Sequence, residues 1–187
     1  PEGAGLLLRV WLPGAKAVEV RELGSGKVLA ASMKCIDKNG LFEQPFTSRK
    51  NPFTYTLHIT YPDSTLDMID PYQFRDEAYS GLAEMKLEAA NLYRTLGAQL
   101  VETEVNGVKV SGVRFAVYAP SATAVSLIGD FNFWDGRRHP MQRSLCGHWV
   151  IFIPGLKPGE RYKYELKDPL GNRLPHKADP VGFYAEQ

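Results

Sequence analysis

The chain has 187 residues, and its 22 Lys and Arg side chains nearly balance its 21 Asp and Glu side chains, so the formal net charge is +1. This balance argues against a nucleic-acid partner or a polybasic membrane partner, because phosphate binding needs a clustered excess of positive charge. No run approaches the roughly 18 apolar residues of a membrane span. The 17 Gly and 13 Pro favour many short strands over long helices.

The first residue and the small number of cysteines lead us to expect an intracellular piece of a longer protein. The first residue is Pro1 rather than Met, so we expect the chain to open partway into that protein. It has two cysteines, Cys35 and Cys146, whereas a disulfide-stapled secreted scaffold uses more. We therefore expect both to be reduced thiols that act as small apolar residues inside the cores.

Short runs of alternating apolar and polar residues predict β-strands along the chain. These runs cover residues 6–12, 17–22, 53–59, 113–118, 124–128, 148–153 and 162–166. Before the fourth run, residues 82–92 are strong helix formers without a β-branched residue, which predicts a short connecting helix capped near Asp76 or Ser80 and stopped at Gly97. The pair Asn106-Gly107 predicts a type I′ hairpin turn.

The chain also repeats itself. Residues 9–20 read RVWLPGAKAVEV and residues 114–127 read RFAVYAPSATAVSL. Three further pairs follow in the same order: 40–46 with 147–153, 53–59 with 161–167, and 70–74 with 179–183. The offset stays nearly constant, from 114 − 9 = 105 to 179 − 70 = 109. This pattern predicts an all-β chain of two tandem immunoglobulin-like β-sandwiches joined by a short helical connection, with domains at 1–75 and 101–187 and the connection at 76–100.

No constellation of catalytic residues stands out. The sequence has no Gly-rich phosphate loop, no Cys/His cluster with metal-ligand spacing and no Gly-x-Ser-x-Gly elbow. Its four histidines, His58, His139, His148 and His176, are scattered, and we expect them to be surface residues or structurally satisfied ones. The sequence therefore predicts no catalytic residue, no metal and no cofactor.

The most unusual segment is residues 128–141, which place three aromatics within four residues beside Asn, Asp and Gly. A Trp on a loop at the sandwich edge exposes a flat apolar plate, on which the C–H face of a sugar ring can stack while polar side chains bind its hydroxyls. The alternative is that the aromatics plug the end of the sandwich. We expect that role for Phe131, and for Trp134 both interpretations stay open.

A second candidate group follows in residues 162–173. Alternation places Tyr162 and Tyr164 on one face of a strand and Lys163 and Glu165 on the other. Lys163 beside Trp134 would donate hydrogen bonds to sugar hydroxyls, whereas the alternative is a solvated Lys with no specific role.

These residues carry a resemblance to a known family. The strings at 129–134, 162–164 and 179–180 resemble carbohydrate-binding module family 48. The longer run FNFWDGRRHPM at 131–141, together with GVRFAVYAP at 112–120 and YRTLGA at 93–98, is similar to the second N-terminal domain of bacterial glycogen branching enzymes. The first repeat, with DPYQF at 70–74, resembles the extra N-terminal sandwich of the longer branching enzymes.

The resemblance implies an α-glucan site and no site in the first domain. It assigns stacking to Trp134 and hydrogen bonding to Lys163, and we add Asn132, Asn172 and Arg173 as polar contacts. Members that bind tightly carry a second Trp in the loop that matches residues 171–173, and this chain has none there. In the first repeat, the segment that matches the Trp134 loop is residues 22–26, which contains no aromatic residue.

Branching enzymes cut α-1,4-glucan and rejoin the piece through an α-1,6 bond, using two carboxyl groups on a (β/α)8 barrel. The resemblance implies that this barrel follows Gln187, so this chain is the non-catalytic N-terminal part of a cytoplasmic enzyme, with α-glucan and the barrel as partners. Two alternatives stay open. In one, the modules serve only for docking; in the other, they belong to an α-glucan debranching hydrolase.

Overall fold

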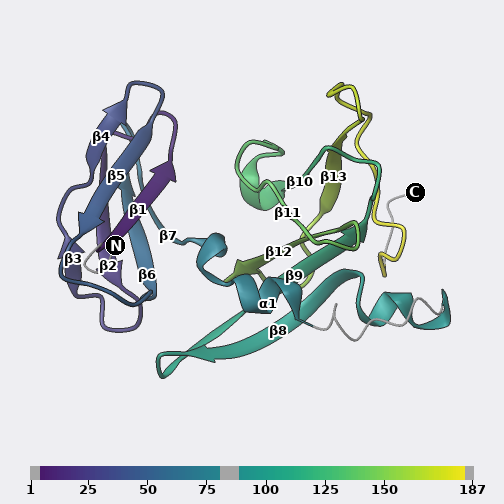
Figure 1. The fold of residues 1–187 in the computed structure, drawn as a ribbon, viewed down its shortest axis with the longest axis horizontal. Helices are drawn as coiled ribbons and strands as arrows, with labels where there is room; N and C mark the ends of the chain where they lie inside the picture. Colours follow the sequence, from purple (N-terminus) through teal and green to yellow (C-terminus); the bar gives the residue numbers. More distant parts are fainter. Residues whose placement is uncertain (1–4, 81–88, 184–187) are drawn as a thin grey trace. The chain divides into compact units, whose positions relative to one another are not determined.

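The computed structural model describes residues 5–80 and 89–183 (Figure 1). The chain divides into two compact units, the first made of residues 1–70 with 105–108, and the second of residues 71–104 with 109–187. Both units are built from antiparallel sheets, which confirms the all-β fold of two tandem sandwiches. The predicted boundaries at 75 and 100 stay a prediction, and residues 71–104 belong to the second unit.

The first unit has two sheets. One has the order β1 (Leu6–Trp11), β5 (Leu41–Phe46), β4 (Lys34–Asp37), and the other has the order β3 (Val28–Ala30), β2 (Ala17–Glu22), β6 (Tyr55–Thr60), β7 (Thr65–Ile69). Every second residue of β2 and β6 faces the core, where Val18 pairs with Ile59 and Val20 with Leu57. Phe42 of β5 fills the core from the opposite sheet. The period of two in the sequence therefore becomes one buried face on each sheet.

The second unit repeats this arrangement. A four-stranded sheet has the order β11 (Gln142–Arg143), β12 (His148–Pro154), β9 (Val108–Tyr118), β8 (Gly97–Val105), and a two-stranded sheet pairs β10 (Ala124–Gly129) with β13 (Tyr162–Lys167). The core between them includes Phe115, Leu127, Ile151 and Tyr164. Phe131 packs against this core, which confirms its predicted role as a plug.

Every predicted strand is present, whereas β3, β4, β5, β7, β8 and β11 were not among the predicted strands. All of these except β5 lie at the edge of a sheet. The segment of β5 was noted only as part of the repeat, where residues 40–46 match residues 147–153. The predicted hairpin turn is confirmed, because Asn106 and Gly107 have φ values of 52° and 78°, as a type I′ turn requires.

The helical segment forms a layer of the second unit. It consists of η1 (Pro71–Gln73), α1 (Arg75–Tyr79) and η2 (Ala89–Arg94), and most of the predicted helix over 82–92 lies outside the described residues. The ring of Phe74 packs 5.4 Å from that of Phe152 on β12. The buried guanidinium of Arg114 on β9 donates to the carbonyls of Ser80 and Thr95. Two carbonyls of the connection are thus bound to the outer face of the sheet.

Both cysteines are exposed and unpaired, so their predicted burial is wrong. Cys35 lies on the edge strand β4, where the register with β5 shifts between Cys35 and Asp37. Cys146 lies in the turn before β12. An irregular edge and a tight turn both direct a side chain away from the core whatever its hydrophobicity.

An equivalent Tyr–Asp hydrogen bond lies inside each unit. Tyr55 opens β6 and donates to Asp70 across 2.6 Å, and Tyr162 opens β13 and donates to Asp179 across 2.5 Å. Both carboxylates belong to Asp-Pro pairs, and burial raises the pKa of both phenols. This correspondence supports the duplication. It also corrects the predicted alignment of residues 53–59 with 161–167 by one position, because Tyr55 corresponds to Tyr162 rather than to Lys163.

Candidate functional site

The candidate site begins where β10 ends. After Gly129 the chain makes one 3-10 turn, η3 (Asp130–Asn132), and then Phe133 and Trp134 both adopt left-handed backbone conformations, with φ values of 58° and 59°. Large aromatic residues rarely adopt this conformation, so two in succession mark a strained loop that its surroundings must hold. The Trp134 amide donates to the Gly129 carbonyl at 2.9 Å and closes the loop.

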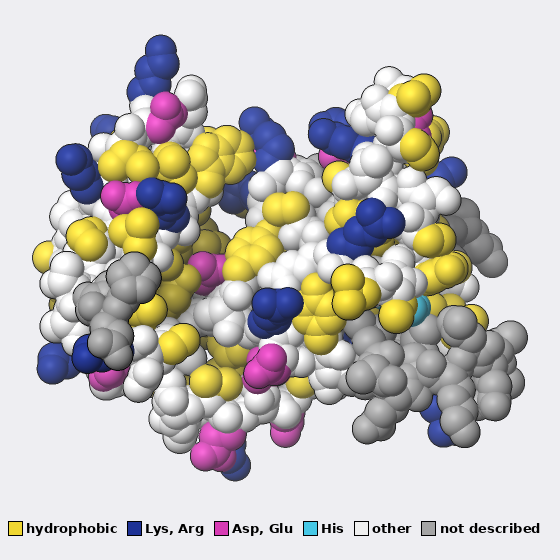
Figure 2. All heavy atoms as spheres, in the orientation of Figure 1, with side chains coloured by type: hydrophobic (Ala, Val, Ile, Leu, Met, Phe, Trp, Pro, Cys, Tyr) yellow, Lys and Arg dark blue, Asp and Glu magenta, His cyan; other side chains and the backbone are white. Residues whose placement is uncertain are grey.

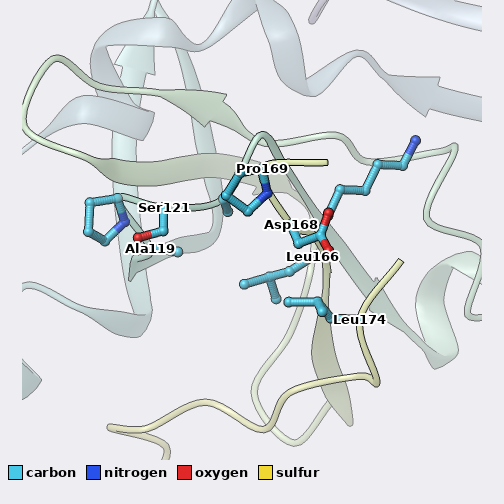
Figure 3. Close-up of a pocket in the computed structure, with 9 residues that line it drawn as sticks. Ala119, Ser121, Leu166, Asp168, Pro169 and Leu174 are labelled. Carbon is cyan, nitrogen blue, oxygen red and sulfur yellow. The ribbon is translucent and has the colours of Figure 1, made fainter. Parts of the chain in front are cut away.

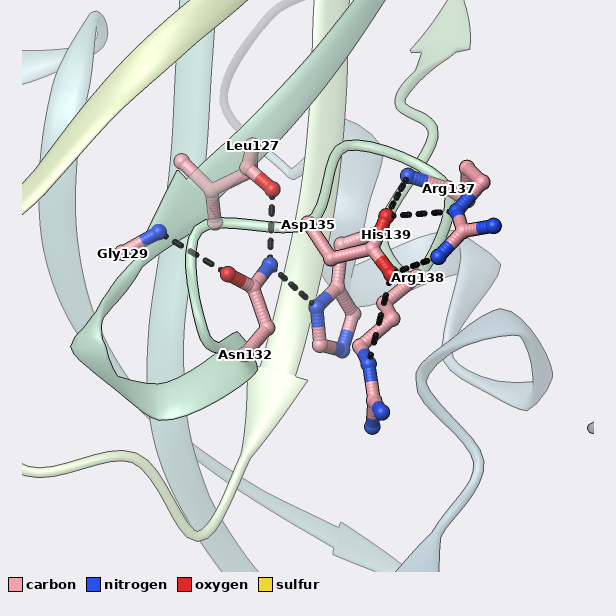
Figure 4. A network of polar contacts seen from close by, with 7 residues as sticks. All are labelled: Leu127, Gly129, Asn132, Asp135, Arg137, Arg138 and His139. Atoms are coloured by element: carbon pink, nitrogen blue, oxygen red, sulfur yellow. Dashed lines mark hydrogen bonds and ion pairs between the residues drawn. The ribbon is translucent and has the colours of Figure 1, made fainter. Parts of the chain in front are cut away.

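Asn132 holds this loop from inside (Figure 4). Its side chain is fully buried: Oδ1 accepts from the Gly129 amide at 2.9 Å, and Nδ2 lies 2.8 Å from both the Leu127 carbonyl and Nδ1 of His139. An amide nitrogen only donates, so Nδ1 of His139 accepts and its ring is neutral. Burial, reinforced by Arg138, lowers the pKa of His139 to about 4, which keeps the ring in this form. In this conformation Asn132 therefore has no free polar atom for the predicted contact with sugar.

Trp134 is partly exposed and fixed at its polar edge. The indole is 37% exposed, and Nε1 donates to Oδ1 of Asp130 at 2.8 Å. The other oxygen of Asp130 accepts from Nε of Arg161 at 2.8 Å. These two hydrogen bonds lower the pKa of Asp130, and the one from Trp134 has the larger effect. The Asp130 carboxyl group therefore stays ionised at neutral pH. The indole is thus a plate with a fixed edge and an accessible face, although composition alone left its role open.

Lys163 lies on the neighbouring strand, opposite Ile128 in the register of β10 and β13. Tyr164 faces the core, as alternation predicts, and Lys163 points away from it. In the part of the chain that the structure describes, the Lys163 ammonium has no ion pair. Its half-buried position and free ammonium suit hydrogen bonding to an external ligand.

Glu165 is the neighbour of Lys163 on this face, and no role was predicted for it. Its carboxylate is nearly buried and lies 3.4 Å from Nε of Arg173 and 3.7 Å from Nε2 of His176. The backbone of Gly136 packs directly over it, since a Cβ there would lie 2.5 Å from Oε1. Glu165 thus joins the loop after Trp134 to the segment after β13.

Asn172 lies in the turn that starts at Asp168. Its Nδ2 donates to Oδ2 of Asp168 at 3.0 Å and its amide donates to Oδ1 at 2.8 Å, and these bonds lower the pKa of Asp168. Both Asn172 and Arg173 remain exposed. Of the five predicted site residues, four are therefore accessible at least in part and Asn132 is not. Their binding roles stay predictions.

Asp130 and Arg161 also belong to the site, and neither was predicted from the sequence. One signal was available, since Asp130 precedes Trp134 by four residues, a spacing that one helical turn brings together. Arg161 reaches the site through pairing, because Gly129 lies opposite Tyr162 and the Asp130 amide donates to the Arg161 carbonyl at 3.3 Å. A single sequence does not show which strands pair, so this residue carried no signal.

A separate hollow of about 240 Å³ lies between residues 119–122 and 166–174 (Figure 3). Its lining is mostly apolar, from Pro120, Ala122, Leu166, Pro169 and Leu174. None of the predicted site residues lines it. It offers few hydrogen-bonding groups for a sugar, so we do not assign it to the candidate site.

Within residues 5–80 and 89–183, no three His, Cys, Asp or Glu side chains are grouped to hold a metal ion. In the same residues, no helix is both long enough and apolar enough to span a bilayer.

Comparison with known proteins gives two family matches. Residues 1–72 match the N-terminal domain of the alpha-1,4-glucan branching enzyme GlgB, and residues 95–182 match carbohydrate-binding module 48, described as the isoamylase N-terminal domain.

Several relatives match nearly the whole chain. The 1,4-alpha-glucan branching enzyme GlgB of Pseudoalteromonas atlantica is 44% identical over 96% of this chain and 25% of its own length. GlgB of Vibrio cholerae is 48% identical over 96% of this chain and 24% of its own length. The chain thus spans about a quarter of the length of the curated relatives that it matches.

Proposed function

We propose that this chain is the N-terminal region of a 1,4-alpha-glucan branching enzyme. In this proposal it binds α-glucan without cutting it and positions the glucan for the catalytic barrel of the parent enzyme. The parent would form α-1,6 branches in α-1,4-glucan in the cytoplasm. The identity to branching enzymes over nearly all of this chain supports this assignment. The exposed, unpaired cysteines fit a reducing compartment.

The observation that carries the proposal is the fixed indole of Trp134. Its Nε1–H is already satisfied by Asp130, so the ligand meets the ring through its face rather than through a hydrogen bond. The C–H face of a glucose ring is the matching surface, and a plate already fixed in place loses little freedom on binding.

Polar groups around the plate would bind the sugar hydroxyls. We propose that Lys163 donates from β13 and that Arg173 and Asn172 contribute from the turn after it. Asn132 takes a different role from the predicted one: it shapes the loop that presents Trp134 and makes no contact with sugar, because its amide is used inside the protein.

A single such site would bind weakly. One stacked ring contributes about 1 kcal/mol, so affinity for a short oligosaccharide is low. On a long polymer, further sites on the same protein would act together and raise the effective affinity. The module would thus keep the enzyme on its polymeric substrate between catalytic events.

A second candidate function is docking alone, and one observation favours it. Phe133, Leu145 and Leu170 of the second unit are each at least 80% exposed, and large exposed apolar side chains often mark an interaction surface. In that case the unit would pack against the catalytic barrel without binding glucan itself.

Native electrophoresis in gels with and without glycogen separates the two. We expect glycogen to retard the wild-type chain and Trp134→Ala to remove most of the retardation. Leu145→Ala removes a fully exposed apolar side chain and serves as the matched control, which should migrate as the wild type does. Wild-type mobility that is unchanged by glycogen would reject glucan binding in favour of docking.

A further inference from the structure

A second indole is exposed on the first unit. In β1 the odd positions point outward while Leu8 and Val10 face the core, so Leu7, Arg9 and Trp11 share the outer face. Trp11 is 47% exposed, more than Trp134, and lies opposite Leu41 of β5 in register. About half of this indole is therefore accessible to a ligand on the outer face of the sheet.

Charged groups lie on the same face of the sheet as this ring. Arg9 lies two residues from Trp11 on the same face, and its Nε lies 2.7 Å from Oε2 of Glu43. Glu43 also lies opposite Lys34 of β4. Arg9 keeps 60% of its side chain exposed, so the face offers both donors and acceptors around an apolar plate.

This mixture favours a sugar over other ligands. The buried centre of a protein interface is depleted in charged residues, whereas here an ion pair lies next to the ring. Nucleic acid needs an excess of positive charge, whereas Glu43 offsets Arg9. A glucose ring needs an apolar plate with donors and acceptors at its edge. Figure 2 shows hydrophobic side chains interspersed with basic and acidic ones over the part of the first unit where Figure 1 shows β1 and β5.

We propose that the outer face of β1, β5 and β4 is a second α-glucan site, with Trp11 as the stacking plate and Arg9 and Glu43 as its hydrogen-bonding edge. This inference rests on the proposed function, since it takes the same ligand. No site was predicted in the first domain, because residues 22–26 lack an aromatic residue. That segment is a turn with Gly24 and Gly26 at positive φ, and the plate lies on the sheet instead.

Binding by single and double variants of the 187-residue chain tests the site. We expect Trp11→Ala to weaken glycogen binding by about fivefold, the equivalent of one stacked ring, and Trp11→Phe to restore part of the loss. Trp134→Ala should leave residual retardation that the double variant with Trp11→Ala removes. Leu66→Ala, on β7 of the other sheet, removes a similarly exposed apolar side chain and should bind as the wild type does.

Fluorescence gives a readout local to Trp11. The chain has three tryptophans, and Trp149 is buried, so Trp134→Phe leaves Trp11 as the exposed one. We expect maltoheptaose to protect Trp11 in this variant from quenching by acrylamide, and Arg9→Ala to reduce that protection. Size-exclusion chromatography without sugar should show that Trp11 is not covered by a second copy.

The outcomes separate this inference from the proposed function. If Trp11→Ala binds glycogen as the wild type does and maltoheptaose leaves the quenching unchanged, the Trp11 site is wrong while the Trp134 site stands. A sugar-free dimer that Trp11→Ala dissociates would likewise overturn it. If glycogen does not retard the wild-type chain at all, both proposals fail together.

Discussion

The indole nitrogen of Trp134 donates to the carboxylate of Asp130 across 2.8 Å, and Arg161 occupies the other carboxylate oxygen. An indole has only this one hydrogen-bond donor, so its edge is committed inside the protein and only its face is available to a ligand. Asp130 therefore acts as a positioning residue for the stacking surface.

Replacing Asp130 should weaken glucan binding without removing the plate. We expect Asp130→Ala to bind glycogen about threefold more weakly, because the ring loses the hydrogen bond that orients it. Asp130→Asn keeps an acceptor oxygen and should stay close to the wild type. Gel retardation measures both, with the exposed Asp63→Ala as the control. Equal affinity of Asp130→Ala and the wild type would contradict the positioning role.

Asn132 and Asn172 should respond in opposite ways to the same substitution. Asn132→Ala leaves buried partners unsatisfied and should lower the free energy of unfolding by about 2–3 kcal/mol. Asn172→Ala changes an exposed side chain and should lower it by less than about 0.5 kcal/mol. Urea unfolding followed by the fluorescence of the buried Trp149 measures the difference. Similar unfolding free energies for the two variants would show that the buried amide does not hold the loop.

The sequence predicted what is decided locally. Alternation alone predicted the buried faces of β2, β6, β10 and β13, and the Asn106-Gly107 pair predicted its turn. The same alternation predicted that Lys163 and Tyr164 point in opposite directions. These features depend only on residues a few positions apart in the chain, so a single sequence is enough to predict them.

Features that depend on distant partners were not predictable in this way. Asn132 sits in a polar loop, where exposure is the ordinary expectation, and only the return of the chain at His139 buries it. The connection was predicted only as a short helix between the domains, yet the buried Arg114 of β9 donates to the carbonyls of Ser80 and Thr95 within it. Trp11 belongs to a strand with apolar residues on both faces, because Leu7 and Trp11 point away from the core that Leu8 and Val10 face, so its position alone did not mark it as a binding residue.

His139 should make the second unit sensitive to acid. Its pKa in the folded chain is about 4, below the ordinary 6.5, so the unfolded chain binds its proton more tightly. Stability is therefore unaffected well above pH 6.5, declines as the pH falls below that value, and has lost about 3 kcal/mol near pH 4. Unfolding free energies measured in urea from pH 7.5 to 4.5 test this. His148 shifts in the same direction, so the comparison that isolates His139 is wild type against His139→Gln. A pH dependence as steep in that variant as in the wild type would contradict the assignment.

The repeated bond between Tyr and Asp gives each unit its own test. Tyr55→Phe removes the donor to Asp70, and Tyr162→Phe removes the donor to Asp179. Each substitution removes one hydrogen bond to a carboxylate and should destabilise its unit by about 1–2 kcal/mol. We expect the smaller loss in Tyr162→Phe, because Oδ2 of Asp179 keeps the hydrogen bond from the Tyr164 hydroxyl at 3.2 Å. Hydrogen exchange followed by mass spectrometry resolves the two units. We expect faster exchange of β2 and β6 in Tyr55→Phe, and of β10 and β13 in Tyr162→Phe. Tyr118→Phe changes a half-exposed tyrosine and should leave both unchanged. If either substitution in a Tyr–Asp pair loosened only the other unit, or neither unit, the bond would not be the equivalent structural element that the duplication requires.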